Sequence, residues 1–467
     1  MKMVRNAVWL LGLAATLPVA CRAQGAKSAA KPAPSDQFPL VKLTGPMRIT
    51  QNTRIAPGTY RMDVADGAAV IEIDADNVEV DLTGVTIESS AANPWERVGI
   101  GVHSRGRSHI TIHGGAIHGY RFGVLLEGDS VAAADIAITG TDLGGSRAQK
   151  LISTPKHYDE NDWVDIFKLE SWESYGGGLY LKNVDGAWIE GVTADGAQNG
   201  ILLAKVTHAT IYHSDLSHNS GWGIALWHSS WNDLLENHAD WDVRCESSSY
   251  SHGCDSAGVL LMDASNRNRI VGNSFTHSGD GYFLSRVENG PESDYNYVAW
   301  NDGSYSPHNA FESTFSEGDE FDHNIADHSD YGFWLGFSHD TTIADNHIEG
   351  SKRDGIAIEH GSGNNIVRNQ IITNGTSGIR LFRSGTALDP SERYTILENN
   401  FTGNPAALIL ERTQDVSVTA NTFANNKVGL KMESGNARIR LQKNRFTPQT
   451  AKRMEAADPS AVTVQIP

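Results

Sequence analysis

Three acidic side chains stand in or beside the strands of a regular apolar pattern. They are Asp280 in SGDGYF, Glu312 in NAFESTF and Glu359 in GIAIEHG. Two carboxyl groups that face a common substrate can divide the work of proton transfer, provided that one has a raised pKa and the other stays ionised. Glu312 and Glu359 are therefore the leading candidates for a catalytic acid and base, and Asp280 is the reserve for either role.

Polar and aromatic side chains lie near these acids or at corresponding positions of the pattern. An aromatic ring offers a flat apolar face on which the C–H face of a sugar can stack, while polar neighbours bind its hydroxyl groups. The residues expected to bind substrate are Arg380, His360, Arg286, Trp334, Trp227, Phe283, Asp263, Asn309, Trp172 and Tyr175, with Trp163 beside the last two.

The segments that would hold these side chains repeat along the chain. Stretches of Gly-aliphatic-x-aliphatic recur at undisturbed intervals of 22 to 24 residues, as from Gly200 to Gly223, and an Asn recurs with the same period, as at Asn301 and Asn324. Apolar residues alternate within each stretch, which is the period of a strand. Two markers in one period predict a solenoid of short parallel strands, with the recurrent Asn stacked along its axis.

Strand alternation also predicts which side chains face outward. If the first and third residues after each Gly point inward, the second and fourth point outward. Glu312 and Glu359 then share the outer face, two coils apart and offset by two residues, so their Cα atoms should lie ~12 Å apart. Convergent side chains would bring the carboxyl groups to roughly 6.5–9.5 Å, the separation at which a water molecule attacks a glycosidic carbon directly.

The repeated sequences GIAIEHG, N-x-I and GIRL resemble those of right-handed parallel β-helix repeat proteins. This group includes many carbohydrate-active enzymes and the copper-associated, NosD-like periplasmic proteins. The resemblance implies an all-β fold, a right-handed parallel β-helix. SGD-G at Asp280 also resembles the SGDD turn of polygalacturonase-type hydrolases, whose NTD and GHG motifs are absent. IEHG at Glu359 resembles the Arg-His-Gly strand of the chondroitinase B and alginate lyase group, with Glu in place of Arg.

The ends of the chain predict export. Lys2 and Arg5 precede an apolar run, which favours a signal peptide at 1–23 and a secreted or periplasmic protein. A lipoprotein anchored at Cys21 is the alternative, against which Pro18 counts. We expect a linker at 24–37, an N-terminal cap at 38–64, the β-helix at 65–446 with insertions at 147–175 and 240–256, and a C-terminal tail at 447–467.

The net charge limits the classes of binding partner, and the cysteines predict a disulfide. The net charge of -18 disfavours nucleic acid and anionic membranes, and no later apolar run is long enough for membrane insertion. We therefore expect a polysaccharide or oligosaccharide partner, while the oligomeric state stays open. Cys245 and Cys254 remain after the signal is removed, and in an exported protein such a pair predicts a local disulfide.

A glycoside hydrolase that needs no cofactor is the leading interpretation, with three alternatives. A polysaccharide lyase would use Arg286, Arg380 or Lys182 as its base and could need calcium. A NosD-like metal-handling protein would draw on the 18 histidines, although these lack fixed ligand spacing and favour solvated turns. A non-catalytic carbohydrate-binding solenoid would explain the aromatic residues but not the acids that accompany them.

Overall fold

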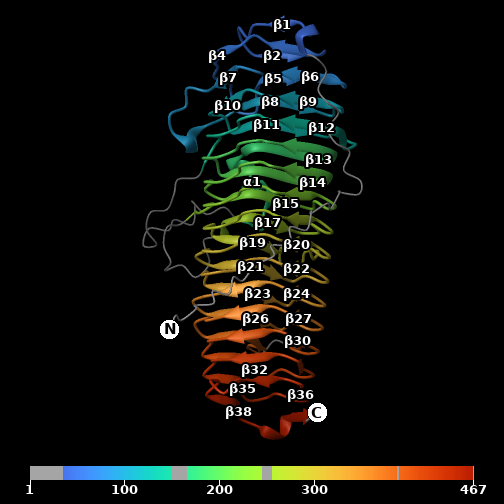
Figure 1. The fold of residues 1–467 in the computed structure, drawn as a ribbon. Helices are drawn as coiled ribbons and strands as arrows, with labels where there is room; N and C mark the ends of the chain where they lie inside the picture. Colours follow the sequence, from blue (N-terminus) through green and yellow to red (C-terminus); the bar gives the residue numbers. More distant parts are fainter. Residues whose placement is uncertain (1–34, 149–165, 245–254, 386–388, 466–467) are drawn as a thin grey trace, which may run out of the picture.

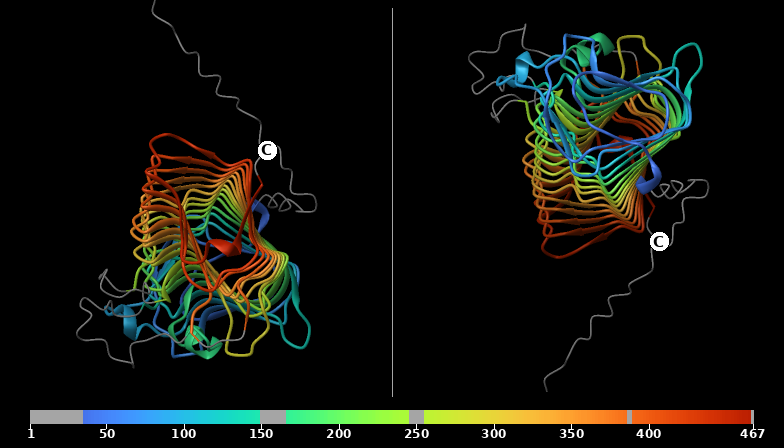
Figure 2. Two further views of the ribbon diagram at one scale, coloured as in Figure 1. Left: turned by 90° about the horizontal axis from the view of Figure 1, so that it is seen from below. Right: turned by 90° about the horizontal axis from the view of Figure 1, so that it is seen from above.

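The computed structural model describes residues 35–148, 166–244, 255–385 and 389–465, which form one right-handed parallel β-helix (Figure 1). All of the strand pairs in it are parallel, as from β19 to β21 and from β21 to β23. Viewed along the axis, the coils lie over one another and enclose a common interior (Figure 2). The predicted fold class is confirmed.

The strands form three columns along the axis of the β-helix. The first column consists of β2 (Met47–Ile49), β5 (Ala69–Ile73), β8 (Ile100–Arg105), β11 (Phe122–Glu127), β13 (Gly177–Glu190), β14 (Asn199–Tyr212), β15 (Trp222–Trp227), β17 (Ala257–Met262), β19 (Asp280–Ser285), β21 (Asn309–Thr314), β23 (Tyr331–Gly336), β26 (Asp354–Glu359), β29 (Ser377–Phe382), β32 (Ala406–Glu411), β35 (Val428–Met432) and β38 (Lys452–Ala456).

The second column belongs to the same sheet, because β13 and β14 are long enough to run through both. Its other strands are β1 (Leu40–Val41), β3 (Thr53–Ile55), β6 (Val78–Asp81), β9 (Ile110–His113), β12 (Ala133–Thr139), β16 (Asp233–Leu235), β18 (Arg269–Val271), β20 (Tyr297–Ala299), β22 (Glu320–Asp322), β24 (Thr342–Ala344), β27 (Asn365–Val367), β30 (Thr395–Leu397), β33 (Ser417–Thr419), β36 (Ile439–Gln442) and β39 (Val462–Gln465).

The third column consists of two short sheets linked by isolated bridges. It contains β4 (Gly58–Arg61), β7 (Val85–Glu88), β10 (Ala116–His118), β25 (His347–Glu349), β28 (Gln370–Ile372), β31 (Asn400–Thr402), β34 (Thr422–Ala424) and β37 (Arg445–Phe446). The helical segments of the described residues are α1 (Leu169–Tyr175) and three 3-10 turns, Ser35–Gln37, Pro94–Glu96 and Pro459–Ala461. None of these helices is long and apolar enough to cross a membrane.

The interior confirms the predicted inward positions and the role of the recurrent Asn. Ile201 and Leu203, the first and third residues after Gly200, are buried in the main core. The Nδ2 of Asn301 donates to Oδ1 of Asn324 at 3.1 Å, and Asn324 donates in the same way to Asn346 at 3.1 Å. These buried amides satisfy one another from coil to coil, as the sequence predicts.

The outer face of the first column is not open along its whole length. Trp172 of α1 packs on Trp222 and Trp227, with ring centroids 4.8 and 5.0 Å apart. Together with Tyr180 and Phe283 these rings belong to a second apolar cluster outside the coil. The expectation that this part of the outer face is an exposed aromatic surface is wrong, because α1 covers it.

The coils continue past the expected boundaries. β1 to β4 lie within 38–64, where a cap was expected, and already pair with later strands, for example β3 with β6. β38 and β39 lie within 447–467 and pair with β35 and β36. The expected signal peptide, most of the insertion at 147–175, and both Cys245 and Cys254 lie outside the described residues, so the disulfide stays a prediction.

Candidate active site

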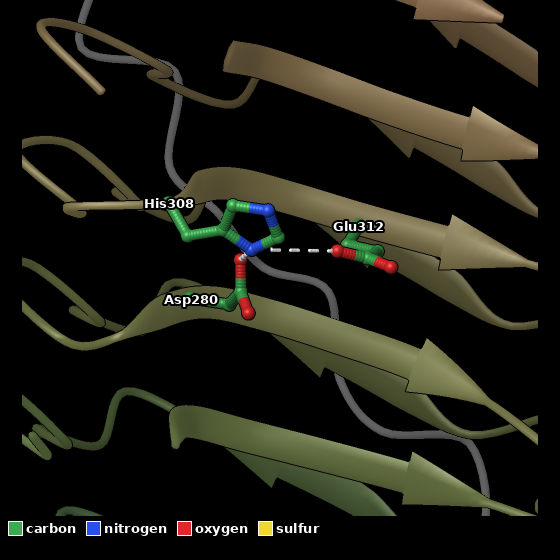
Figure 3. A group of neighbouring side chains, drawn as sticks. All are labelled: Asp280, His308 and Glu312. Atoms are coloured by element: carbon green, nitrogen blue, oxygen red, sulfur yellow. Dashed lines mark ion pairs between the residues drawn. The ribbon is translucent and has the colours of Figure 1, made fainter. Parts of the chain in front are cut away.

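Three titratable side chains meet on the outer face of β19 and β21 (Figure 3). Nδ1 of His308 lies 2.9 Å from Oδ1 of Asp280 and 3.7 Å from Oε2 of Glu312. Asp280 is the first residue of β19, His308 directly precedes β21, and Glu312 lies within β21. An imidazole therefore stands between two carboxyl groups that come from neighbouring coils.

The turn before β21 fixes this arrangement through its backbone. The N–H of His308 donates to the carbonyl of Gly279 at 3.2 Å, and the N–H of Asn309 donates to Oδ1 of Asp280 at 2.8 Å. The Nδ2 of Asn309 also donates to Oε2 of Glu312. Asn309 is fully buried, so it positions both carboxyl groups instead of facing a substrate.

The three members of the cluster differ in their access to solvent. The Asp280 side chain is 1% exposed, whereas those of His308 and Glu312 are 14% and 11% exposed. A substrate on the outer face could thus touch His308 and Glu312, while Asp280 acts from beneath.

Burial and the neighbouring charges set the protonation of the two accessible groups. Burial raises the pKa of Glu312 to about 8, and the charge of Asp280 adds to this effect more than His308 opposes it. Burial works against the charged form of His308, but Asp280 and Glu312 outweigh it and raise the His308 pKa to about 9. Near pH 7 this gives a neutral Glu312 carboxyl beside an imidazolium, so Glu312 has a proton to give.

Glu312 lies where the covered face gives way to an open one. In the strand register it stands between Phe283 of β19 and Trp334 of β23. Phe283 is buried in the apolar cluster, whereas Trp334 is partly exposed and contacts Tyr331 and Phe382, with centroids 5.0 and 6.2 Å away. Trp334 is the aromatic neighbour of the cluster that a ligand could reach.

Glu359 has the predicted place in the register. Trp334 pairs with Ala357, and Glu359 lies two residues further along β26, beside Gly336. Its side chain is 21% exposed and accepts a hydrogen bond from the Ser384 hydroxyl. Among the described residues, no hydrogen bond or ion pair joins Glu359 to Glu312, so the two acids share one face without direct contact.

A family model described as "Periplasmic copper-binding protein (NosD)" matches residues 69–289 and 276–458. This protein belongs to the NosD family. No curated protein matches the chain.

The NosD-family chain is also similar to several solved structures. The mannuronan C-5 epimerase AlgE4 A-module of Azotobacter vinelandii has 12% identity and a TM-score of 0.41, over 89% of this chain and 91% of that chain. PfbA, a surface adhesin of Streptococcus pneumoniae, has 11% identity and a TM-score of 0.41, over 87% and 86%. DFA-IIIase from Arthrobacter chlorophenolicus A6 has 12% identity and a TM-score of 0.42, over 76% and 88%. Likenesses at this level assign no activity.

The clusters of His, Asp and Glu among the described residues contain no cysteine, the thiolate ligand that copper(I) favours. Two groups bring three potential ligand atoms within 4.8 Å of one another: Asp280, His308 and Glu312, and Asp322, His323 and Asp345. Each has one imidazole and no sulfur, whereas copper(I) favours Cys and Met. In the first group His308 and Glu312 retain protons that a metal would have to displace, and in the second Asp345 is held by Arg368. No catalytic step here is therefore assigned to copper.

Several residues expected to bind substrate have structural roles instead. His360 is 1% exposed, stacks on Phe337 at 4.8 Å, and contacts the backbone of Ser384 through Nε2. β26 does end at Glu359, as access for His360 required, but the left-handed turn directs the ring against Phe337. The expectation that His360 binds substrate is wrong, because the ring is buried.

Asp263 and Arg286 support the loop after β19. The buried carboxylate of Asp263 accepts the N–H of Val287 at 2.9 Å. Arg286 donates to the carbonyl of Gly290 at 2.8 Å and lies over the ring of Phe315, 4.6 Å from its centroid. Asp263 is buried away from solvent, which contradicts a substrate-binding role, and the described contacts of Arg286 hold a loop.

The aromatic walls expected from Trp172, Trp227 and Phe283 are wrong for the same physical reason. Their exposed fractions are 1%, 8% and 6%, because each is buried in the second apolar cluster, in which Trp172 of α1 packs on Trp227. Tyr175 is partly buried against that cluster, and Trp163 lies outside the described residues. Arg380 is partly exposed, lies over Phe382 at 4.6 Å and pairs with Glu411 at 3.2 Å.

The sequence did not single out His308. Its side chain joins the cluster because the turn before β21 places it over the coil that carries Asp280. A usable signal was present: His308 sits four residues before Glu312, in the coil where Ala-Phe-Glu-Ser-Thr-Phe replaces the usual Gly-aliphatic pattern.

Proposed function

We propose that this protein is an exported glycoside hydrolase in which Glu312 is the general acid. The observation that carries the proposal is the nearly buried Glu312 carboxyl, 11% exposed on the outer face, whose pKa is raised to about 8 by burial and by Asp280. A carboxylic acid that keeps its proton near neutral pH can protonate the oxygen of a glycosidic bond as that bond breaks.

Glu359 is the matching base in this proposal. It would take a proton from water while the water oxygen bonds to the anomeric carbon, and the proton of Glu312 would go to the departing sugar. The register places Glu359 two coils and two residues from Glu312, a Cα separation of ~12 Å for ideal strands. That geometry suits inversion by direct attack of water.

Asp280 is better suited to a supporting role than to attack. Its oxygen lies within 4.8 Å of the Glu312 ligand oxygen, which resembles the close spacing of retaining enzymes. However, its side chain is 1% exposed and is occupied by His308 and the Asn309 N–H. We therefore assign Asp280 to hold His308 and to keep Glu312 protonated.

The lyase alternative has less support from the described side chains. A base must have a free electron pair, yet Lys182 pairs with Glu173 at 2.6 Å and Arg380 with Glu411 at 3.2 Å. Calcium, which some lyases use, prefers oxygen ligands, whereas the cluster places an imidazole at its centre.

The family description as periplasmic supports export, and the net charge of -18 favours a neutral or weakly charged glycan.

A glycan screen of the purified protein tests the proposal. Reducing ends are measured together with absorbance near 235 nm, because elimination creates a double bond and hydrolysis does not. On a cleaved glycan, Glu312→Gln and Glu359→Gln should each lower kcat by at least about a hundredfold, in line with the usual worth of general acid–base catalysis. Glu320→Gln, an exposed glutamate of β22, is the matched control and should keep the wild-type rate.

Two outcomes would contradict the hydrolase. Wild-type turnover by both Glu variants would remove the proposed acid and base. Unsaturated products that disappear in Arg380→Ala or Arg286→Ala would replace hydrolysis by elimination.

A further inference from the structure

Residues in the left-handed backbone conformation recur at one corner of each coil. After β16, β18, β20 and β22 these residues are Glu236, Gly272, Trp300 and His323, with φ values of 51°, 72°, 58° and 53°. Successive strands pair in register, so corner residues of neighbouring coils lie one above another along the axis. The corner forms a column of side chains in which Gly272 contributes none.

Among the described residues, an aromatic ring stacks on only one face of Trp300. His323 of the next coil stacks on it, with ring centroids 4.1 Å apart and planes at 18°. Val271 pairs with Ala299, so Gly272 and Trp300, the next residues of the two coils, occupy corresponding corner positions. The opposite face of Trp300 therefore points toward Gly272 of the preceding coil. Trp300 is 56% exposed, in agreement with an uncovered face.

The space at Gly272 is open, unlike that at comparable glycines. A Cβ added at Gly318 would lie 2.5 Å from the ring of Tyr295, and one at Gly350 would lie 2.5 Å from the ring of His328. Those rings fill the places left by the two glycines. Among the described residues other than the chain neighbours of Gly272, the only atom within 4 Å of a Cβ added there is Cγ of Glu236, at 3.4 Å.

The gap is about one sugar ring thick. Glu236 and Trp300 lie two coils apart, which is roughly 9.6 Å for ideal strand spacing. Subtracting half the thickness of the Glu236 side chain and half that of the Trp300 ring from this separation leaves room for one sugar ring. A cavity of about 610 Å³ opens here, and its lining includes His213, Glu236, His238, Gly272, Trp300 and Asp302.

We propose that this cavity binds one pyranose ring of a neutral glycan, stacked on the free face of Trp300. A sugar combines an apolar C–H face with hydroxyl groups at its edge. The cavity likewise combines one aromatic face with carboxylate, imidazole and hydroxyl groups. Glu236 and His213 can accept from and donate to hydroxyl groups at the rim.

The charges of the cavity favour a neutral ring over a flat cation. Oε2 of Glu236 lies 2.6 Å from Nε2 of His213, and Oδ1 of Asp302 accepts the N–H of Ser304 at 3.0 Å. His238 and His323 add further imidazoles. The carboxylates therefore already have donors beside them, which weakens the attraction of a cation.

This site is separate from the acid cluster and does not rest on the proposed hydrolase. Glu312 lies on the outer face of the first column, whereas Trp300 follows a strand of the second column. The cavity would hold a glycan without cleaving it, so binding here and turnover at Glu312 can succeed or fail independently.

Calorimetric titration of the full chain with cellohexaose, xylohexaose, mannohexaose and chitohexaose tests the site. The titrations are repeated in a Glu312→Gln background, so that turnover does not consume the ligand. Trp300→Ala removes the platform, and Gly272→Asn fills the gap, because Asn tolerates the left-handed conformation. The matched controls are Trp241→Ala, which is 51% exposed but stacks on His277, and Gly140→Asn, a left-handed glycine with open space around it.

We expect at least one hexasaccharide to bind and both cavity variants to weaken it at least about tenfold, equivalent to ~1.4 kcal/mol. Both controls should keep the wild-type affinity. Binding by none of the four sugars, or binding that neither Trp300→Ala nor Gly272→Asn changes, would overturn the proposal. Binding of benzamidine, a flat cation, in preference to every sugar would also overturn it.

Discussion

At the scale of single residues, the chemistry depends on where the protons of Glu312 and His308 reside. Both groups have raised pKa values, of about 8 and about 9, but for different reasons. Burial disfavours the charge of Glu312, whereas the Asp280 carboxylate stabilises the charge of His308 against burial. The same carboxylate thus keeps a proton on both neighbours.

Activity should fall as pH rises through about 8, because Glu312 must carry a proton to act as the acid.

The folded pKa of Glu312 exceeds the ordinary glutamate value, so the folded protein binds this proton more tightly than the unfolded chain. The contribution of Glu312 to the free energy of unfolding therefore falls as pH rises from about 4.5 to about 8, by at most ~1.4 kcal/mol per pH unit. The melting temperature of Glu312→Gln relative to wild type should accordingly rise across that window. A pH-independent difference would contradict the raised pKa.

Asp280→Asn should lower the pKa of His308. Without the carboxylate, the effect of burial on the imidazole is opposed less strongly, and the proton should leave below pH 9. Titration of the His308 ring signal by NMR, identified by its loss in His308→Ala, measures the change. Asp345→Asn, which acts on a distant coil, is the control. An unchanged His308 titration would separate Asp280 from the cluster.

At the scale of elements, α1 decides which part of the outer face is open. The helix brings Trp172 onto Trp222 and Trp227, while Glu173 bonds to Lys182 at 2.6 Å and to the Tyr180 hydroxyl at 2.6 Å. The apolar cluster that includes Trp172 extends along the outer face to Phe283, which pairs in register with Glu312. This cluster therefore borders the candidate site.

Trp172→Ala should loosen this cover. Truncating a buried Trp to Ala costs ~3–5 kcal/mol, since it leaves a cavity where the indole ring was packed. We expect a lower melting temperature and faster proteolysis near α1, with the coils themselves retained by circular dichroism. Trp241→Ala removes a ring that is 51% exposed and should cost far less. Equal effects of the two substitutions would show that α1 does not anchor through Trp172.

At the scale of the whole molecule, stacking of coils is stabilised by repeated polar contacts as well as by the apolar core. The buried side chain of Asn324 accepts from Asn301 and donates to Asn346 and to the carbonyl of Val298. Each amide satisfies buried backbone groups that would otherwise lack partners, so the ladder runs through the coils as a unit.

Asn324→Ala should destabilise the β-helix by ~1–3 kcal/mol or more, because it leaves the buried Asn301 N–H and Val298 carbonyl without this partner. Thermal melting measures the loss. Asn400→Ala, at a partly exposed position of β31, is the matched control. A melting temperature equal to that of the control would show that the ladder does not contribute to stability.

The sequence by itself determined the repeat and the placement of residues that the repeat dictates. A period of 22 to 24 residues with alternating apolar positions specifies coils of parallel strands, since only that register buries Ile201 and Leu203 together and aligns Asn301 with Asn324. The same rule placed Glu312 and Glu359 two coils apart. These features are local and periodic, so they recur from coil to coil and can be recognised in the sequence.

Only the tertiary structure decided what covers the outer face and which side chains meet there. α1 lies outside the repeat, and no periodic pattern shows that its Trp172 packs on Trp227. His308 reaches Asp280 of the neighbouring coil because a turn directs it there, and turn conformation depends on contacts between coils. Burial and charge then raise the pKa of Glu312, and both are properties of the assembled neighbours and not of the residue alone.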